Sequence, residues 1–118
     1  MEEFKVIIAG GRDFDDYELL EKNLDFLFQN KENVVVVSGK ASGADSLGER
    51  YAKDRGLKIK EFPAEWNKYG KSAGYRRNEQ MAQNADALVA FWDGVSRGTK
   101  HMIEVAKSNE LRIRIVEY

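Results

Sequence analysis

The chain has 118 residues, 42% of them apolar, which suits one domain with one hydrophobic core over residues 1–118. Its 19 basic and 20 acidic side chains give a formal net charge of −1, so there is no overall attraction to polyanions and nucleic acid is disfavoured as a partner. The absence of cysteine excludes disulfides and thiolate chemistry, and without a signal peptide or a bilayer-length apolar run we expect a cytoplasmic protein that does not bind membranes.

The hydrophobic pattern alternates between strand-like and helix-like segments along the chain. Short runs rich in β-branched and aromatic residues predict five strands, at 4–9, 33–38, 58–62, 86–92 and 111–116. Apolar stripes with helical spacing predict four helices, over about 17–28, 44–55, 73–84 and 98–108. The segment 63–72 is expected to be a loop. The order βαβαβαβαβ with short connections predicts a three-layer Rossmann-like α/β domain with a parallel five-stranded sheet and four flanking helices.

The unusual residues of the chain gather in the loops that follow the first four strands. These loops are polar, aromatic or rich in glycine, whereas the loops at the opposite edge are plain solvated turns. Ligands of parallel α/β sheets bind outside the carboxyl ends of the strands, so we expect a site there. The candidate ligand-binding residues are Gly10, Gly11, Arg12, Asp13, Ser38, Gly39, Gly43, Asp45, Trp66, Lys71, Arg77, Asn78, Trp92, Asp93, Ser96, Arg97, Gly98 and Thr99.

The stretch SGKASGAD at 38–45 allows two interpretations. Gly39 and Gly43 let the backbone approach a phosphate at the start of the second helix. Alternatively, the glycines only turn the chain, while Ser42 and Asp45 form a capping box. Asp45 would repel a phosphate lying directly against it, so we assign it to capping or to a sugar hydroxyl. The spacing matches neither the dinucleotide fingerprint nor the P-loop, so it signals neither hydride transfer nor ATP hydrolysis.

The loop after the first strand is equally open to two interpretations. Its arginine, Arg12, presents a guanidinium fork that suits a phosphate or a carboxylate. Alternatively, Arg12 pairs with Asp13 and pins the loop, while Asp15 or Asp16 caps the first helix.

Two further regions carry similar alternatives. The segment 96–99 either donates hydrogen bonds to phosphate or is a capped helix start with an exposed Arg97. Asn78 lies on the apolar stripe of the third helix, so its amide is expected to point inward and to be hydrogen-bonded. Trp66 and Trp92 lie near strand ends, where each either stacks on a base or packs in the core.

Five ordered motifs together resemble one family over essentially the whole chain. The motifs are GGRDF at 10–14, SGKASGAD at 38–45, the FPAEW loop, GKSAGYRRNEQM at 70–81 and FWDGVSRGTKHMI at 91–103. They resemble the YspA-related branch of the SLOG superfamily, which also contains the Lonely guy phosphoribohydrolases and the DNA-processing protein A family. The resemblance implies a Rossmann-like domain that binds a nucleotide-derived, phosphate-bearing ligand such as an ADP-ribose derivative and requires no other cofactor. It also implies a homo-oligomer, a dimer or larger, with Tyr69 and Tyr75 as exposed candidates for pairing.

The resemblance also implies roles for particular residues. In the Lonely guy enzymes an Arg-Lys pair stands where this chain has Arg77 and Asn78. The two glycine-rich phosphate loops of the superfamily correspond here to Ser38, Gly39 and Gly43, and to Gly98 with Thr99.

The catalytic glutamate of the Lonely guy enzymes has no counterpart here. Its position is taken by Met102, and Glu104 lies about 200° further around the helix, so it does not substitute. The leading hypothesis is therefore a protein that binds, senses or sequesters its ligand without transforming it. The first alternative is a phosphoribohydrolase-like nucleotide hydrolase in which Asp13, Asp45 or Asp93 supplies the carboxylate.

A nucleic-acid-associated protein is the third hypothesis, resting on the DNA-processing relatives alone. No set of serine, histidine and aspartate and no cluster of metal ligands is recognisable. The single histidine, His101, is expected to be an exposed helical residue.

Overall fold

The computed structural model describes residues 2–118 and contains one five-stranded sheet. Its strands are all parallel, in the order β3-β2-β1-β4-β5, which confirms the predicted fold class. The chain builds outward from β1 to β3 and then returns to the other side of β1 to form β4, so the strand order reverses between β1 and β4. The strands are β1 (Phe4–Gly10), β2 (Val34–Ser38), β3 (Lys58–Glu61), β4 (Ala87–Trp92) and β5 (Arg112–Glu117).

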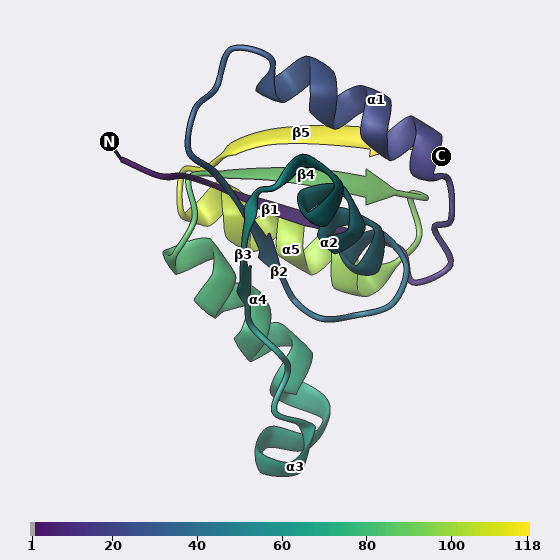
Figure 1. Cartoon of the computed structure of the whole chain (residues 1–118). Helices are drawn as coiled ribbons and strands as arrows, with labels where there is room; N and C mark the ends of the chain where they lie inside the picture. Colours follow the sequence, from purple (N-terminus) through teal and green to yellow (C-terminus); the bar gives the residue numbers. More distant parts are fainter. Residues whose placement is uncertain (1) are drawn as a thin grey trace.

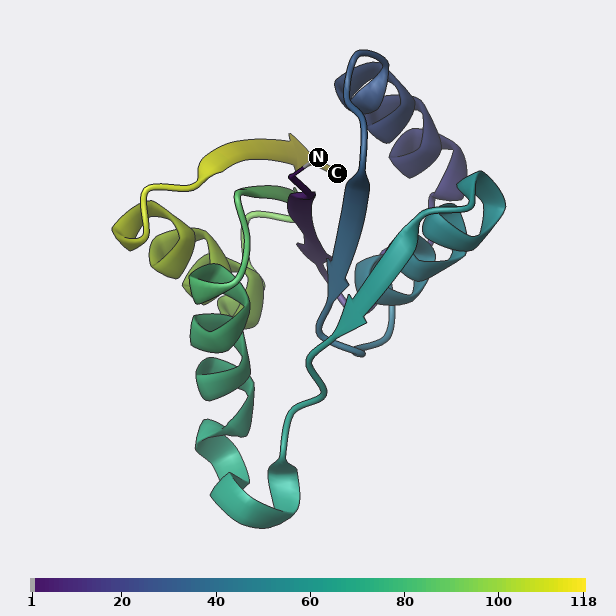
Figure 2. The same ribbon diagram turned by 60° about the vertical axis from the view of Figure 1, so that its left-hand side comes forward.

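Four long helices cover the two faces of the sheet, as the apolar stripes predicted. One face carries α1 (Tyr17–Phe28) and α2 (Ala44–Arg55), and the other carries α4 (Ala73–Gln83) and α5 (Arg97–Ser108), as Figures 1 and 2 show. Within residues 2–118, every helix is too short or too polar to cross a bilayer.

Alternation along the central strand divides the apolar residues into two cores. Val6 and Ile8 of β1 face α1 and α2, whereas Ile7 and Ala9 face α4 and α5. All four side chains are buried, as expected for a strand with helices on both sides. Gly48 lets α2 approach the sheet closely, because a Cβ at this position would lie 2.8 Å from the side chain of Ile8.

The segment after β3 is helical rather than a loop, which corrects the expectation for residues 63–72. It forms the short helix α3 (Trp66–Tyr69) and the 3₁₀ turn η1 (Gly70–Ser72), and both protrude from the sheet edge (Figure 2). Gly70, at φ +58°, ends α3 by donating its N–H to the Trp66 carbonyl. None of these seven residues is buried, so no apolar periodicity marked them as helical.

The starts of α1 and α2 are capped differently. Asp16 caps α1, because its side chain accepts the Leu19 N–H at 3.0 Å. Of the two aspartates proposed as the cap, Asp15 and Asp16, it is therefore Asp16 that caps the helix. The N-cap of α2 is Gly43, which has no side chain to accept a hydrogen bond. The capping box proposed for Ser42 and Asp45 is therefore wrong.

Candidate functional site

A cleft of about 520 Å³ lies at the carboxyl ends of β1 and β4, where the strand order reverses. We call it the switch-point cleft. Its volume falls in the range of small-molecule and nucleotide sites. It is lined by Ala9, Gly10, Gly11, Arg12, Asp13, Ala41, Asp45, Trp66, Lys71, Gly74, Tyr75, Arg77, Asn78, Met81, Asp93, Ser96, Gly98, Thr99 and Met102.

The floor of the cleft is backbone, held by hydrogen bonds between two loops. The N–H of Gly11 donates to Phe91 at 3.1 Å, and the carbonyl of Gly11 accepts the N–H of Ala44 at 3.3 Å. Gly43, at φ +75°, lies so close that a Cβ would collide with the Gly11 carbonyl. Glycine at position 43 therefore permits the close contact between the two loops. Gly43 itself does not line the cleft.

Three cationic side chains, Arg12, Lys71 and Arg77, line the cleft. Arg77 is fixed, because its Nη1 donates to the Gly39 carbonyl at 2.5 Å and its Nε to Asn78 Oδ1 at 3.0 Å. Burial lowers the pKa of Arg77, the neighbouring Asp45 opposes this, and the charge of Arg12 lowers it further. Two guanidinium groups thus lie close together at one side of the cleft, an arrangement that an anion stabilises.

Asp45 is the one buried carboxylate in the cleft. Its side chain accepts the N–H of Ala41 at 3.4 Å, and the residue is 5% exposed. Burial raises the pKa of Asp45 to about 6, although the charge of Arg77 lowers it. A group that titrates in this range can exchange a proton near neutral pH. Catalysis by Asp45, the hydrolase alternative, stays a prediction.

The other two aspartates proposed for catalysis hold loops in place. Asp13 accepts a hydrogen bond from the Tyr118 hydroxyl at 2.8 Å. Asp93 accepts the N–H groups of Val95 and Ser96 at 2.9 and 2.8 Å, and these hydrogen bonds lower its pKa. Both side chains therefore stabilise the walls of the cleft, and the lowered pKa of Asp93 does not suit a general acid.

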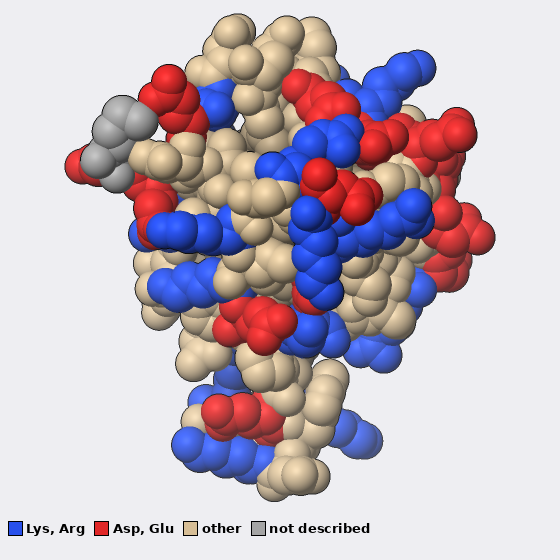
Figure 3. Space-filling view, in the orientation of Figure 1, with Lys and Arg blue, Asp and Glu red and all other residues tan. Residues whose placement is uncertain are grey.

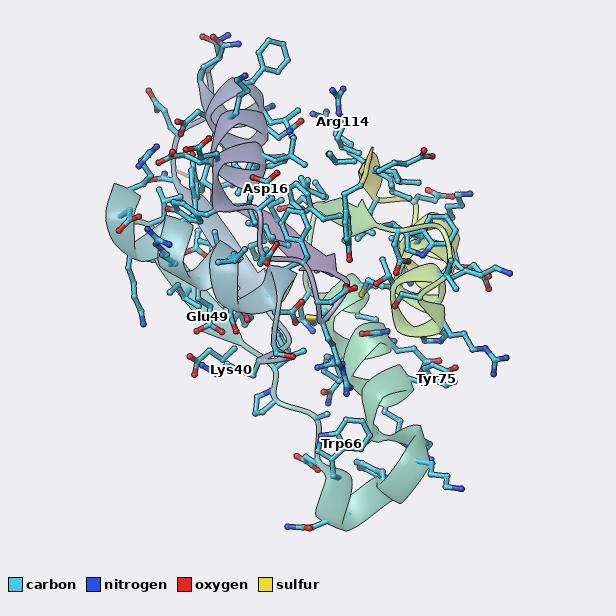
Figure 4. All side chains as sticks on the ribbon, turned by 90° about the vertical axis from the view of Figure 1, so that its right-hand side faces the viewer. Asp16, Lys40, Glu49, Trp66, Tyr75 and Arg114 are labelled. Carbon is cyan, nitrogen blue, oxygen red and sulfur yellow. The ribbon has the colours of Figure 1, made fainter. Side chains whose placement is uncertain are left out.

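A buried polar network fixes the loop that follows β2. The hydroxyl of Ser38 donates to Glu49 at 2.6 Å, and the Lys40 ammonium reaches Glu49 and Glu61 at 3.0 and 3.1 Å. Burial raises the pKa of Glu49, but the bonds from Ser38 and Lys40 outweigh it and hold this pKa below its ordinary value. Figure 4 shows Lys40 and Glu49 side by side, away from Tyr75. The loop is thus fixed by contacts with Glu49 and Glu61, and the charge of Lys40 is already paired.

Several predicted site residues lie outside the switch-point cleft. Ser38 is fully buried in the polar network. Trp92 packs in the core beside α4 and α5 and donates its Nε1–H to the Ser96 carbonyl at 3.1 Å, so it supports the loop and does not line the cleft. Arg97 is exposed, and neither it nor Gly43 lines the cleft. Gly39 lines an adjoining cavity.

Sequence reasoning missed Tyr75 and His101 as neighbours of the site. The ring of Tyr75 lines the cleft and stacks on His101, with centroids 4.2 Å apart. His101 is half-buried, and its Nδ1 lies 3.1 Å from Nδ2 of Asn78, which is buried and hydrogen-bonded as predicted. Tyr75 precedes Asn78 by three positions, so helical spacing already placed the two on one side of α4.

Charge on the molecular surface is mixed. Figure 3 shows basic and acidic side chains interspersed over the face that carries α2. Within residues 2–118 no group of three or more histidine, aspartate or glutamate side chains is placed to hold a metal ion. The cationic character of the cleft is therefore local.

Comparisons with known proteins agree on family and fold. The model of the YspA, cpYpsA-related SLOG family matches residues 4–69. The Gene 61 protein of Mycobacterium phage D29 is 34% identical over 110 residues, which cover 87% of this chain and 88% of that protein.

Two solved structures share the fold. DNA processing protein A from Streptococcus pneumoniae superposes with a TM-score of 0.78 at 19% identity, covering 96% of this chain and 50% of that one. DNA processing protein A from Helicobacter pylori, described with a single-stranded DNA binding mode, gives a TM-score of 0.69 at 17% identity, covering 95% of this chain and 64% of that one. This chain thus spans between half and two thirds of those neighbours.

These neighbours correct one expectation. Net charge near zero predicts that nucleic acid is disfavoured as a partner, and this prediction is wrong, because a protein of this fold has a single-stranded DNA binding mode. Net charge averages over the whole surface, whereas a strand of nucleic acid meets only the cations at its site.

Proposed function

This chain belongs to the YspA, cpYpsA-related SLOG family, and we propose that it binds single-stranded nucleic acid in the switch-point cleft. Arg12, Lys71 and Arg77 neutralise the phosphates, and the exposed N-terminal end of α5 adds N–H groups. The bases rest against aromatic rings at the rim.

The observation that carries the proposal is the pairing of exposed aromatic rings with cations in one cleft. Trp66 and Tyr75 are 49% and 48% exposed, large fractions for aromatic side chains, and both line the cleft beside Arg12 and Arg77. Figure 4 shows Trp66 on the segment that protrudes below the sheet edge and Tyr75 on α4. Stacking on exposed rings combined with backbone neutralisation is how proteins hold single strands without reading sequence.

The fold comparison supports the proposal. The Helicobacter pylori neighbour, which is described with a single-stranded DNA binding mode, shares the arrangement of sheet and helices. At 17% identity the likeness concerns the fold, so the case for this chain depends on its own aromatic and cationic residues.

A free nucleotide derivative, such as an ADP-ribose derivative, is the second candidate. It is favoured by the start of α5, where Ser96, Gly98 and Thr99 line the cleft and no acidic residue occupies the first turn. Such a ligand places a terminal phosphate at this helix end and a sugar hydroxyl near Asp45.

Fluorescence anisotropy with a labelled oligothymidylate of about 20 nucleotides tests the leading proposal. We expect micromolar affinity, with log K falling against log salt at a slope of about −2, as for roughly three phosphate contacts. Arg12→Ala is expected to weaken binding about tenfold. Arg114→Ala, which removes the same charge from β5, is the matched control and is expected to leave affinity unchanged.

If the protein binds no oligonucleotide even at low salt, the leading proposal is contradicted. Calorimetric titration with ADP-ribose, NAD and AMP then decides the second candidate. Micromolar binding of one of these ligands, weakened by Arg12→Ala but not by Arg114→Ala, is the result that would favour it.

A further inference from the structure

A second cavity of about 470 Å³ adjoins the switch-point cleft. It lies between the loop after β2 and the segment that leads into α3, and we call it the side cavity. Arg12, Ala41, Trp66 and Arg77 line both spaces, so the two form one groove with a shared wall. Each space has the volume of a site for one small ligand.

The junction between the two cavities carries positive charge. Arg77 is partly buried there, and burial is the main cause that lowers its pKa. The charge of the nearby Arg12 lowers this pKa further. Within residues 2–118 the Arg12 side chain forms no ion pair or hydrogen bond with a protein group, so its guanidinium remains available to a ligand. The buried carboxylate of Asp45 offsets only one of the two charges.

Among the described residues that line the side cavity, no further free cation joins Arg12 and Arg77. The lysine of the side cavity, Lys40, is already bound by Glu49 and Glu61 at 3.0 and 3.1 Å. An anion in the groove is therefore stabilised most at the junction, beside Arg12 and Arg77, and an uncharged group suits the side cavity better.

We propose that the groove holds two consecutive nucleotides of a single strand, with the phosphodiester that joins them at Arg12 and Arg77. One nucleoside occupies the switch-point cleft beside Tyr75, and the next enters the side cavity with its base against Trp66. This inference rests on the proposed function and adds to it the length of the ligand that the site recognises. A phosphodiester carries one negative charge, which matches the single positive charge of the Arg12 and Arg77 pair that Asp45 does not offset.

Affinity measured against ligand length tests the inference. The probes are thymidine 5′-monophosphate, the 5′-phosphorylated dinucleotide pdTpdT and the corresponding trinucleotide, titrated calorimetrically. We expect the dinucleotide to bind at least about tenfold tighter than the mononucleotide, because it adds a base stack and the junction contact. The third nucleotide is expected to add less than about threefold, since the two spaces that share Arg12, Trp66 and Arg77 are already filled by the first two nucleotides.

Two variants locate the second nucleotide. Trp66→Ala is expected to remove most of the dinucleotide advantage and to change mononucleotide affinity less than about threefold. Phe26→Ala, which removes an exposed ring from α1, is its control. Ser42→Glu places a carboxylate in the side cavity and is expected to act on the dinucleotide alone, whereas Ser108→Glu at the end of α5 makes the same change elsewhere.

The outcomes separate this inference from the proposed function. Equal affinity for mononucleotide and dinucleotide, or a steady rise with every added nucleotide, overturns the two-nucleotide groove while oligonucleotide binding stands. Failure of the long oligothymidylate to bind overturns both. The inference is also overturned if Phe26→Ala weakens dinucleotide binding as much as Trp66→Ala does, or Ser108→Glu as much as Ser42→Glu. The effect would then not come from the side cavity.

Discussion

The N-terminal ends of α2 and α5 both reach the carboxyl edge of the sheet through a glycine-bearing loop, but their first turns differ. The first turn of α2 contains Asp45, a buried carboxylate that already occupies the space before the helix and accepts the Ala41 N–H. The first turn of α5 has no acidic residue, and Gly98 and Thr99 open onto the cleft. Glycine spacing thus marks where the backbone passes closely, whereas first-turn charge decides which helix end can receive an anion.

The loops that precede these helices also differ in what holds them. The loop before α2 is fixed by the buried side chains of Ser38 and Glu49. The loop before α5 is held by an exposed Asp93, which accepts two backbone N–H groups within its own turn. One loop is therefore part of the folded core and the other is a local turn.

The largest contrast is expected from glycine replacements in the two loops. Gly43→Ala should lower the free energy of unfolding by about 3 to 4 kcal/mol, because it combines strain at φ +75° with a collision against the Gly11 carbonyl. Gly94→Ala, at φ +85° with open space around it, should cost only about 1 kcal/mol. Urea denaturation measures both values, and equal losses would show that the loops are equivalent.

The pH dependence of stability should report on Asp45. Its pKa of about 6 in the folded state lies above the ordinary 3.8, so the folded state binds this proton more tightly than the unfolded state. The free energy of unfolding therefore falls as pH rises from about 4 to about 6, by about 2 kcal/mol after relaxation of the site. Asp45→Asn removes this contribution, so its stability relative to wild type should rise over the same range and stay level above it.

Groups with a lowered pKa, such as Asp25, change stability in the opposite sense as pH falls. The comparison with Asp45→Asn cancels their contribution, because they are present in both proteins. Parallel pH curves for the two proteins would show that Asp45 has an ordinary pKa.

The buried network behind the β2 loop should matter less than the glycine contact. Glu49→Ala leaves the Ser38 hydroxyl and the Lys40 ammonium without their shared acceptor, and we expect it to lower the free energy of unfolding by about 2 kcal/mol. Glu104→Ala on the exposed face of α5 is the matched control and should change stability little. Thermal denaturation checks both variants. An undiminished melting temperature in Glu49→Ala would show that the loop does not depend on the Glu49 contacts.

The smallest expected effect concerns hydroxyl groups at the two helix starts. Thr99→Val keeps the side-chain volume but removes a hydroxyl at the cleft wall that donates to Ser96 Oγ at 3.3 Å, and it should weaken binding of a 5′-phosphorylated oligonucleotide about threefold. Ser42→Ala at the start of α2 should leave affinity within about twofold. Anisotropy titration distinguishes the two, and a larger loss in Ser42→Ala would place the phosphate at α2 instead.

The fold could be predicted because its signals are local and repeated. Runs such as Val34–Ser38 have no polar face, which is typical of a strand between two layers of helices, and the alternation of five such runs with helical stripes leaves few topologies. The segment at α3 was missed because none of its residues is buried, so it has no apolar stripe to detect.

The sequence predicted the edge of the sheet where the cleft lies and most of the residues that line it, but not which residues of that edge pack into the core. Which side chains of that edge face the cleft depends on packing between distant segments, and spacing along the chain does not record it. Trp92 turns into the core to support Ser96, while Tyr75 reaches the cleft from another element. The hydrogen bonds of Ser38 and Lys40 to Glu49 could not be predicted for the same reason, since they form only when α2 packs on the sheet.

The protruding segment Trp66–Ser72 makes one wall of the groove independent of the rest of the molecule. Arg12 and Asp45 lie on elements whose glycines and buried side chains also hold the sheet together, so most changes there disturb folding. Trp66 lies on a short helix without a single buried residue, which follows β3 and continues through η1 into α4. Substitutions in this wall are therefore expected to cost little stability, so ligand preference can change there without loss of the fold.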